Sequence, residues 1–198
     1  VDLDGVLRDW SACEAAVLER EQAYGLPPGS LLRTAFEPPR LMPALTGEVG
    51  DEQWRLGVAR VLAAQVGTEK AVDLVTTWGE SAGVVDAETL ASVSALRAHG
   101  VPVVLVTNAT TRLEFDLVRL DLHDKFDAVA SSARLGVVKP GAGIYLAAAA
   151  MAGVEAEECV FVDDSAANVA GAERLGMAGV VFSGPPSIAV ARDILAVG

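Results

Sequence analysis

The sequence has little cysteine, few aromatic residues and no long apolar run, and these shortages narrow the possible classes of protein. Among 198 residues only Cys13 and Cys159 are cysteines, and their separation fits no metal-binding spacing. We therefore expect two free, buried thiols and a reducing, cytoplasmic location. No uninterrupted apolar segment reaches the roughly 20 residues that span a membrane, so we expect no membrane-spanning helix.

The first residues also lack the basic segment and apolar stretch of an export signal, and we expect none. Because the sequence starts at Val1 and not at a methionine, residues before the first strand could be missing from it. Basic residues are scarce as well, since 15 Lys and Arg face 27 Asp and Glu, for a formal net charge of −12. Such a surface repels nucleic acid and anionic lipid, so we expect neither as a partner.

The apolar content is high, at 52%, and its pattern divides the chain into two parts. From about residue 10 to residue 85 the pattern predicts helices and no convincing strand. From Asp86 onward, short apolar runs alternate with amphipathic stretches, which predicts alternating strands and helices. The expected strands are residues 101–106, 127–130, 159–162 and 179–182; Asp86 should begin, and Gly100 end, the helix before the first of them.

This alternation predicts an α/β fold with a Rossmann-like parallel sheet of about five strands, flanked by helices. We assign residues 1–9 and 86–198 to this core. Residues 10–85 form a helical insertion after the first strand, and such an insertion lies above the carboxyl ends of the strands. That edge is where open α/β sheets bind ligands.

Polar residues stand where the buried strands end, and parallel strands bring their ends to one edge. Four carboxylates and one lysine then share one crevice, and two carboxylates about 4 Å apart repel each other by about 4 kcal/mol at an effective dielectric of 20. Raised pKa values or a bound cation must relieve this, and Mg²⁺ suits a site that shares its ligands with phosphate. The residues are Asp2, Asp4, Thr107, Asn108, Lys139, Asp163 and Asp164.

These residue types are suited to phosphoryl transfer. A carboxylate can attack phosphorus and form an aspartyl-phosphate. A second carboxylate two residues further on can protonate the leaving group and later deprotonate water, which contributes roughly 10² to 10⁴ in rate. The hydroxyl of Thr107 can hold phosphate oxygens, while Lys139 and Mg²⁺ offset the negative charge of the transition state.

In these residues the sequence resembles the haloacid dehalogenase superfamily, whose four motifs appear in order. They are Asp2-Leu3-Asp4-Gly5-Val6-Leu7, Val106-Thr107-Asn108, Val138-Lys139-Pro140 and the segment from Phe161 to Asn168. The resemblance implies Asp2 as nucleophile, Asp4 as general acid and base, and Thr107, Asn108 and Lys139 as phosphate-binding residues. It also implies Mg²⁺ held by the Asp2 carboxylate, the Asp4 backbone carbonyl and Asp164, with Asp163 assisting.

The helical insertion resembles the small type 1 cap of this superfamily. Residues 47–54 resemble a segment of the subgroup that contains α-D-glucose-1-phosphate phosphatase and the N-terminal phosphatase domain of soluble epoxide hydrolase. We therefore predict a Mg²⁺-dependent phosphomonoester hydrolase that acts on a small phosphorylated metabolite, with a sugar phosphate as the leading guess. The oligomeric state stays open. Possible substrate contacts are Arg8, Arg40, Arg55, Trp10, Trp54 and Trp78, although packing or solvation is their ordinary role.

Other functions stay open at this stage. A phosphomutase of the β-phosphoglucomutase type shares the motifs. A 2-haloacid dehalogenase lacks the second acid of the first motif and usually the acidic pair of the fourth, which argues against it. A response-regulator receiver has similar residues in a different order and no helical insertion. A catalytically silent binding protein on this scaffold would retain the fold without turnover.

Overall fold

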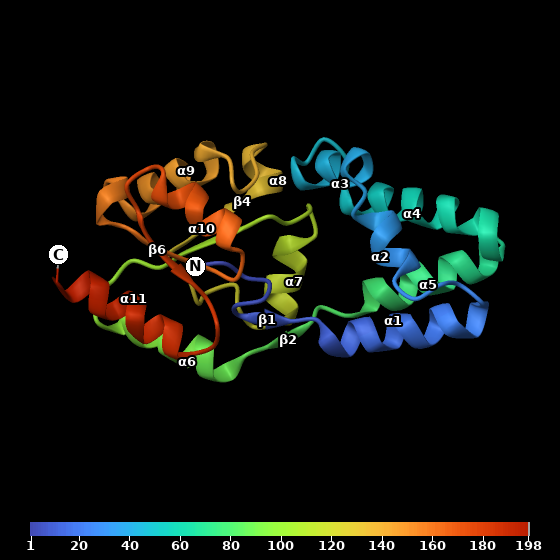
Figure 1. The fold of residues 1–198 in the computed structure, drawn as a ribbon, viewed down its shortest axis with the longest axis horizontal. Helices are drawn as coiled ribbons and strands as arrows, with labels where there is room; N and C mark the ends of the chain where they lie inside the picture. The colour runs from blue at the N-terminus through green and yellow to red at the C-terminus, as the bar shows by residue number, and fades with distance from the viewer. Residues whose placement is uncertain (198) are drawn as a thin grey trace.

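The N-terminal helices gather at one end of the molecule and the alternating strands and helices at the other (Figure 1). The structure is a computed structural model and describes residues 1–197. The helices at the first end are α1 (Ser11–Tyr24), α2 (Ser30–Ala35), α3 (Pro38–Leu45), α4 (Asp51–Val66) and α5 (Thr68–Glu80).

These five helices have a hydrophobic cluster of their own, formed by side chains from residues 10–78 and centred on Leu31, Trp54, Leu62 and Trp78. The Trp54 and Trp78 rings meet edge to face, with centroids 5.1 Å apart. A separate cluster is what an inserted cap requires, so it supports the division into a core of residues 1–9 and 86–198 and a cap of residues 10–85. That boundary remains our proposal.

The second end contains two pairs of parallel strands and confirms the predicted α/β fold. β3 pairs with β4, and β5 pairs with β6. The elements after α5 are β2 (Val84–Val85), α6 (Ala87–Ala98), β3 (Val104–Thr107), α7 (Leu113–Arg119), β4 (Ala128–Ser131), α8 (Ser132–Leu135), α9 (Ala142–Ala152), the 3₁₀ turn η1 (Ala156–Glu158), β5 (Val160–Asp163), α10 (Ala166–Glu173), β6 (Ala178–Val181) and α11 (Pro186–Val197).

The first two residues join the two pairs of strands into one layer. The amino group of Val1 donates to the carbonyl of Val104 at 3.0 Å, and the N–H of Val106 donates to the carbonyl of Val1 at 2.9 Å. On the other side, the N–H of Asp2 donates to the carbonyl of Val162 at 2.9 Å. Asp2 therefore lies between β3 and β5, in the middle of the sheet.

The sheet is buried on both faces because alternate side chains of its strands belong to different hydrophobic clusters. Leu105 packs into a cluster with residues of α6, α7 and α11. Its neighbours Val104 and Val106 pack into another, with residues of α9 and α10. Figure 1 shows these two groups of helices on opposite sides of the strands.

Two short strands, β1 (Arg8–Asp9) and β2, carry the chain from the sheet into the helices and back. They pair antiparallel, with Arg8 opposite Val85 and Asp9 opposite Val84. The sequence analysis expected no strand between residues 10 and 85, and β2 corrects it. Two residues are too few to produce an alternating apolar pattern.

The predicted ends of α6 are confirmed. The Asp86 side chain accepts a hydrogen bond from the N–H of Thr89 at 2.6 Å, and Gly100 follows the helix with φ of +84°. Across residues 1–197, no helix combines the length and the apolar character that crossing a membrane would take.

Candidate active site

A buried lysine links two of the predicted acidic residues at the carboxyl edge of the sheet. The Nζ atom of Lys139 lies 2.6 Å from Oδ1 of Asp2 and 2.7 Å from Oδ2 of Asp163. All three residues are less than 10% exposed. The first, third and fourth motifs therefore meet although they are separated by up to 161 positions in the sequence.

Asp163 is held by several donors in addition to Lys139. The N–H of Ser165 donates to its Oδ1 atom at 2.8 Å, and Nδ2 of Asn168 lies 3.1 and 3.2 Å from its two oxygens. Ser165 also begins α10 and accepts from the N–H of Asn168 at 3.4 Å. The start of α10 thus orients a carboxylate that is completely buried.

Asn108 positions the backbone of Lys139. Its Oδ1 atom accepts from the Lys139 N–H at 2.8 Å, and its Nδ2 atom donates to the Lys139 carbonyl at 3.0 Å. Both polar atoms of this side chain are therefore engaged with the lysine. The predicted contact of Asn108 with phosphate stays a prediction.

Thr107 ends β3 and is only 1% exposed. Its register partner in β4 is Ser131. Among the residues that the structure describes, the Thr107 hydroxyl makes no hydrogen bond. An unengaged hydroxyl at the end of a central strand is suited to binding a phosphate oxygen, as the sequence predicts.

Asp164 is exposed and lies against the loop that carries the first motif. A Cβ atom placed on Gly5 would overlap its Oδ2 atom, so only glycine permits this approach. Gly5 also has φ of +78°, which side chains other than glycine rarely adopt. The glycine of the first motif thus gives Asp164 its place next to Asp2.

Asp2, Asp163 and Asp164 form a group that suits a divalent cation. Each offers a carboxylate oxygen, and these oxygens lie within 4.8 Å of one another. Burial raises the pKa of Asp2 to about 7, although Lys139 opposes the shift. Burial, and then the charge of Asp163, also raise the pKa of Asp164. Three carboxylates against one ammonium leave two negative charges, and the oxygen donor set fits Mg²⁺.

Asp4 lies outside this group and its side chain faces the helical insertion. Nε and Nη2 of Arg8 donate to its two oxygens at 2.6 and 3.0 Å, and Nε1 of Trp10 donates to Oδ1 at 2.6 Å. Its predicted contact with Mg²⁺ runs through the backbone carbonyl and stays a prediction. The Asp4 carboxyl group thus lies apart from the cation group and is oriented by Arg8 and Trp10.

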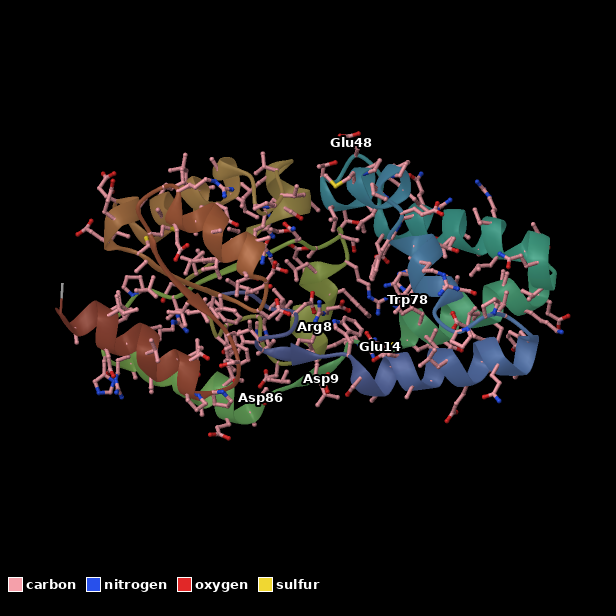
Figure 2. All side chains as sticks on the ribbon, viewed as in Figure 1. Arg8, Asp9, Glu14, Glu48, Trp78 and Asp86 are labelled. Atoms are coloured by element: carbon pink, nitrogen blue, oxygen red, sulfur yellow. The ribbon has the colours of Figure 1, made fainter. Side chains whose placement is uncertain are left out.

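A cavity of about 330 Å³ opens beside Asp4, between the sheet edge and the five helices. Arg8, Glu14 and Trp78 contribute to its lining and lie where α1 and α5 meet the α/β part (Figure 2). Of the predicted substrate contacts, five line this cavity: Arg8, Arg55, Trp10, Trp54 and Trp78. Arg40 does not; it donates to the carbonyl of Thr34 and to Glu37.

The sequence analysis did not predict the contacts of two residues of this site. Arg8 was expected to be solvated by default, yet it is 5% exposed and bound to Asp4. Asn168 was named only as the end of the fourth motif and received no role, yet it holds Asp163. The position of Arg8 four residues after an acid was a possible signal, since that spacing often indicates an ion pair.

Comparison with known proteins gives a match to a family model described as haloacid dehalogenase-like hydrolase, over residues 1–176. Hexitol phosphatase B of Escherichia coli (strain K12) is 36% identical over 84 residues, which are 42% of this chain and 38% of that protein. The sesquiterpene phosphatase of Aspergillus oryzae is 30% identical over 124 residues, 60% of this chain and 62% of that protein. The matches thus span less than two thirds of the length of these relatives.

The fold has close counterparts among solved structures. An enzyme of the HAD family from Bacteroides thetaiotaomicron, solved with magnesium and inorganic phosphate, superposes with a TM-score of 0.68 and 20% identity. The match covers 92% of this chain and 91% of that one. At this level of identity the likeness concerns the fold.

Proposed function

Because the chain belongs to the haloacid dehalogenase-like hydrolase family, we propose that it is a Mg²⁺-dependent phosphomonoester hydrolase that works through an aspartyl-phosphate on Asp2. The observation that carries this proposal is the junction of Asp2, Lys139 and Asp163, with Asp164 alongside. It supplies a nucleophile, a fixed positive charge and a set of cation ligands in one place.

The attacking atom that we assign is Oδ2 of Asp2. The other oxygen, Oδ1, accepts from the N–H of Leu3 at 2.7 Å and from Lys139. Those two bonds fix the orientation of the carboxylate. In the first step Oδ2 bonds to phosphorus, the bond from phosphorus to the ester oxygen breaks, and Asp4 gives its proton to the departing alkoxide.

In the second step water attacks the phosphorus of the aspartyl-phosphate. Asp4, now a carboxylate, takes a proton from that water, and the bond between phosphorus and Oδ2 of Asp2 breaks. Inorganic phosphate leaves and both aspartates return to their starting states. Throughout, Thr107 and Lys139 donate hydrogen bonds to the phosphoryl oxygens, which stabilises the charge of the transition state.

Mg²⁺, when bound, would neutralise part of the negative charge of the phosphoryl group. The residues that would hold it are Asp2 and Asp164, with Asp163 assisting and the Asp4 carbonyl as a further oxygen. The buried bonds from Ser165 and Asn168 to Asp163 maintain this ligand set in advance.

The alternatives are not equally supported. Asp4 faces a cavity with its carboxyl group, and an acid there serves a phosphate ester, because a haloacid dehalogenase releases a halide that needs no proton. Membership of the family and the order of the motifs disfavour a receiver module. A phosphomutase would have to retain and reorient its product, so the product that is formed distinguishes it from a phosphatase.

The substrate that we propose is a small phosphorylated metabolite. The names of the relatives include a hexitol phosphatase, which supports the sugar phosphate predicted from the sequence, and a sesquiterpene phosphatase, which does not. Sequence similarity therefore leaves the alcohol of the ester undecided.

The test is release of inorganic phosphate from a panel of phosphomonoesters, with Mg²⁺ and with excess EDTA. We expect turnover only with Mg²⁺, and we expect Asp2→Asn to remove it while circular dichroism shows an intact fold. Full activity in EDTA would refute the metal requirement, and substantial turnover by Asp2→Asn would refute the nucleophile. A mutase would instead give an isomeric phosphate ester without free phosphate.

A further inference from the structure

We infer that the alcohol released by this enzyme is hydrophobic, and that the cavity beside Asp4 binds its hydrocarbon part. This inference rests on the proposed phosphatase activity and narrows its substrate class. It departs from the sugar phosphate that the sequence suggested. Two features of the cavity carry it: the apolar wall that faces Asp4, and the engagement of its polar groups with one another.

The wall contributed by the helices is apolar. The apolar side chains that line the cavity together with Asp4 come from all five helices of the insertion and from the turn after α2, so the whole insertion contributes to one hydrophobic surface. Phe36 stacks on Trp54 with ring centroids 6.5 Å apart, and Trp54 meets Trp78 edge to face. Aliphatic residues that line the same cavity are Val17, Leu32, Leu41 and Leu45.

The charged side chains that line the cavity, apart from Glu14, form ion pairs with one another. Both oxygens of Asp51 are engaged, one with Oγ1 of Thr110 at 2.7 Å and the other with Nε of Arg55 at 2.7 Å. Asp116 accepts from Arg8 and, at 2.9 Å, from Arg112. A sugar or hexitol would have to leave its hydroxyl groups unpaired against the apolar wall or break these bonds, and both are costly.

Asp4 and Asn108, which also line the cavity, are bound to Arg8 and Trp10 and to the backbone of Lys139. Arg55 retains a buried nitrogen, Nη1, for which residues 1–197 provide no partner. Its guanidinium carbon lies 4.2 Å from the centroid of the Trp78 ring. The two N–H groups of Nη1 can serve at most two substrate oxygens, whereas a hexitol phosphate carries five free hydroxyl groups. Glu14 is exposed and belongs to the outer part of the cavity.

The experiment compares esters that differ only in the alcohol. Ethyl, butyl, hexyl and octyl phosphate form a series of increasing apolar length, and sorbitol 6-phosphate matches hexyl phosphate in carbon number. We expect kcat/KM to rise by about fourfold per methylene group until the cavity is filled. We expect hexyl phosphate to exceed sorbitol 6-phosphate by about 100-fold or more, because hydrophobic sites reject a ligand whose polar groups stay unpaired.

A substitution in the apolar wall of the cavity tests whether this wall causes the preference for long alkyl esters. Phe36 is 50% exposed, so Phe36→Ser is expected to fold, and it removes part of the apolar surface. It should lower kcat/KM for hexyl phosphate by about tenfold and leave ethyl phosphate nearly unchanged. Leu18→Ser is the matched control, since Leu18 is an exposed residue of α1 (45%) outside the lining of the cavity. It should leave both substrates unchanged.

The outcomes separate this inference from the proposed function. If sorbitol 6-phosphate is hydrolysed as well as hexyl phosphate or better, the inference is wrong and the phosphatase proposal stands. A flat response to chain length, or an equal effect of Phe36→Ser on short and long esters, also overturns the inference. If no ester in the series is hydrolysed with Mg²⁺, the proposed function itself fails.

Discussion

Arg8 holds Asp4 through two hydrogen bonds, from Nε to Oδ1 at 2.6 Å and from Nη2 to Oδ2 at 3.0 Å. The same guanidinium reaches Asp116 of α7 at 3.3 Å and the carbonyl of Ala82 at 3.5 Å. Arg8 belongs to β1, which pairs with β2, so it connects the proposed general acid with both chain segments that enter and leave the helical insertion. The position of Asp4 is thereby linked to the position of the helices.

We predict that Arg8→Lys lowers kcat by about tenfold or more for alkyl phosphates. A lysine cannot make the paired contact of a guanidinium, so Asp4 loses its fixed orientation. The loss should be much smaller for 4-nitrophenyl phosphate, whose leaving group departs without a proton. The measurement is the ratio of kcat for the two substrates in wild type and variant.

Arg20→Lys serves as a control for this variant, because Arg20 forms an exposed ion pair with Asp73 and neither residue lines the cavity beside Asp4. It should change neither kcat value. An equal loss on both substrates in Arg8→Lys would mean that Arg8 supports the fold and does not position the acid.

Asp86, the N-cap residue of α6, should contribute stability that depends on pH. The hydrogen bond from the backbone N–H of Thr89 lowers the pKa of Asp86. A lowered folded-state pKa means that the contribution is present above the unfolded pKa of about 4 and is lost as the pH falls through the folded value. Asp86→Ala should therefore lower the free energy of unfolding by about 1 kcal/mol at pH 7 and by less at pH 3.

Asp86→Asn is the matched variant for this test, because asparagine caps helices about as well as aspartate and does not titrate. Urea unfolding at pH 7, 5 and 3 gives the comparison. The Asn variant should retain its stability relative to Ala at every pH. A difference between wild type and Asp86→Ala that stays constant from pH 7 to pH 3 would contradict the assigned cap.

The core of the site could be predicted from the sequence because parallel strands have one consequence that does not depend on side-chain detail. Residues that follow buried strands meet at one edge. Asp2 and Asp163 were named on that ground, and Lys139 because it stands just before the next helix; the structure places the three in contact. The fold class followed from the same alternation of strands and helices, and it is confirmed.

What the sequence could not provide are contacts that depend on side-chain packing. Arg8 and Asp116 lie 108 positions apart, and no pattern links them. The pairing of Asn108 with the backbone of Lys139 also needs coordinates, because an amide after a strand is equally able to face a ligand. The apolar wall of the cavity consists of residues whose helical spacing predicts only burial, so its orientation toward Asp4 could not be read from the pattern.

Asn168 should control the affinity of the site for Mg²⁺ through Asp163. Asn168→Ala removes the side-chain donor from a carboxylate that is completely buried, and loss of such supporting bonds typically costs about 10- to 100-fold in metal affinity or activity. We expect the Mg²⁺ concentration for half-maximal activity to rise by that factor. Titration of Mg²⁺ at saturating substrate measures it.

Ser165→Ala is the control for Asn168→Ala. It removes the side-chain cap of α10 but keeps the backbone N–H that donates to Asp163. It should lower the free energy of unfolding by about 1 kcal/mol and leave the Mg²⁺ requirement unchanged. If both variants shift the Mg²⁺ requirement equally, the intact start of α10 sets the affinity for Mg²⁺ and the side chain of Asn168 has no separate role.

Gly5→Ala offers the sharpest test of the cation group, because the chain contains a glycine with the same backbone conformation and no neighbour. Gly5 and Gly25 have φ of +78° and +76°. A Cβ on Gly25 would meet nothing within 4 Å, whereas a Cβ on Gly5 would overlap Asp164. The left-handed conformation costs an alanine about 1–2 kcal/mol in either place, so both variants should lose similar stability.

Gly5→Ala should in addition displace Asp164 and raise the Mg²⁺ requirement at least tenfold, while Gly25→Ala should match wild type in activity. Equal Mg²⁺ titrations for the two variants would contradict the proposed role of Asp164, because a Cβ on Gly5 overlaps its carboxylate.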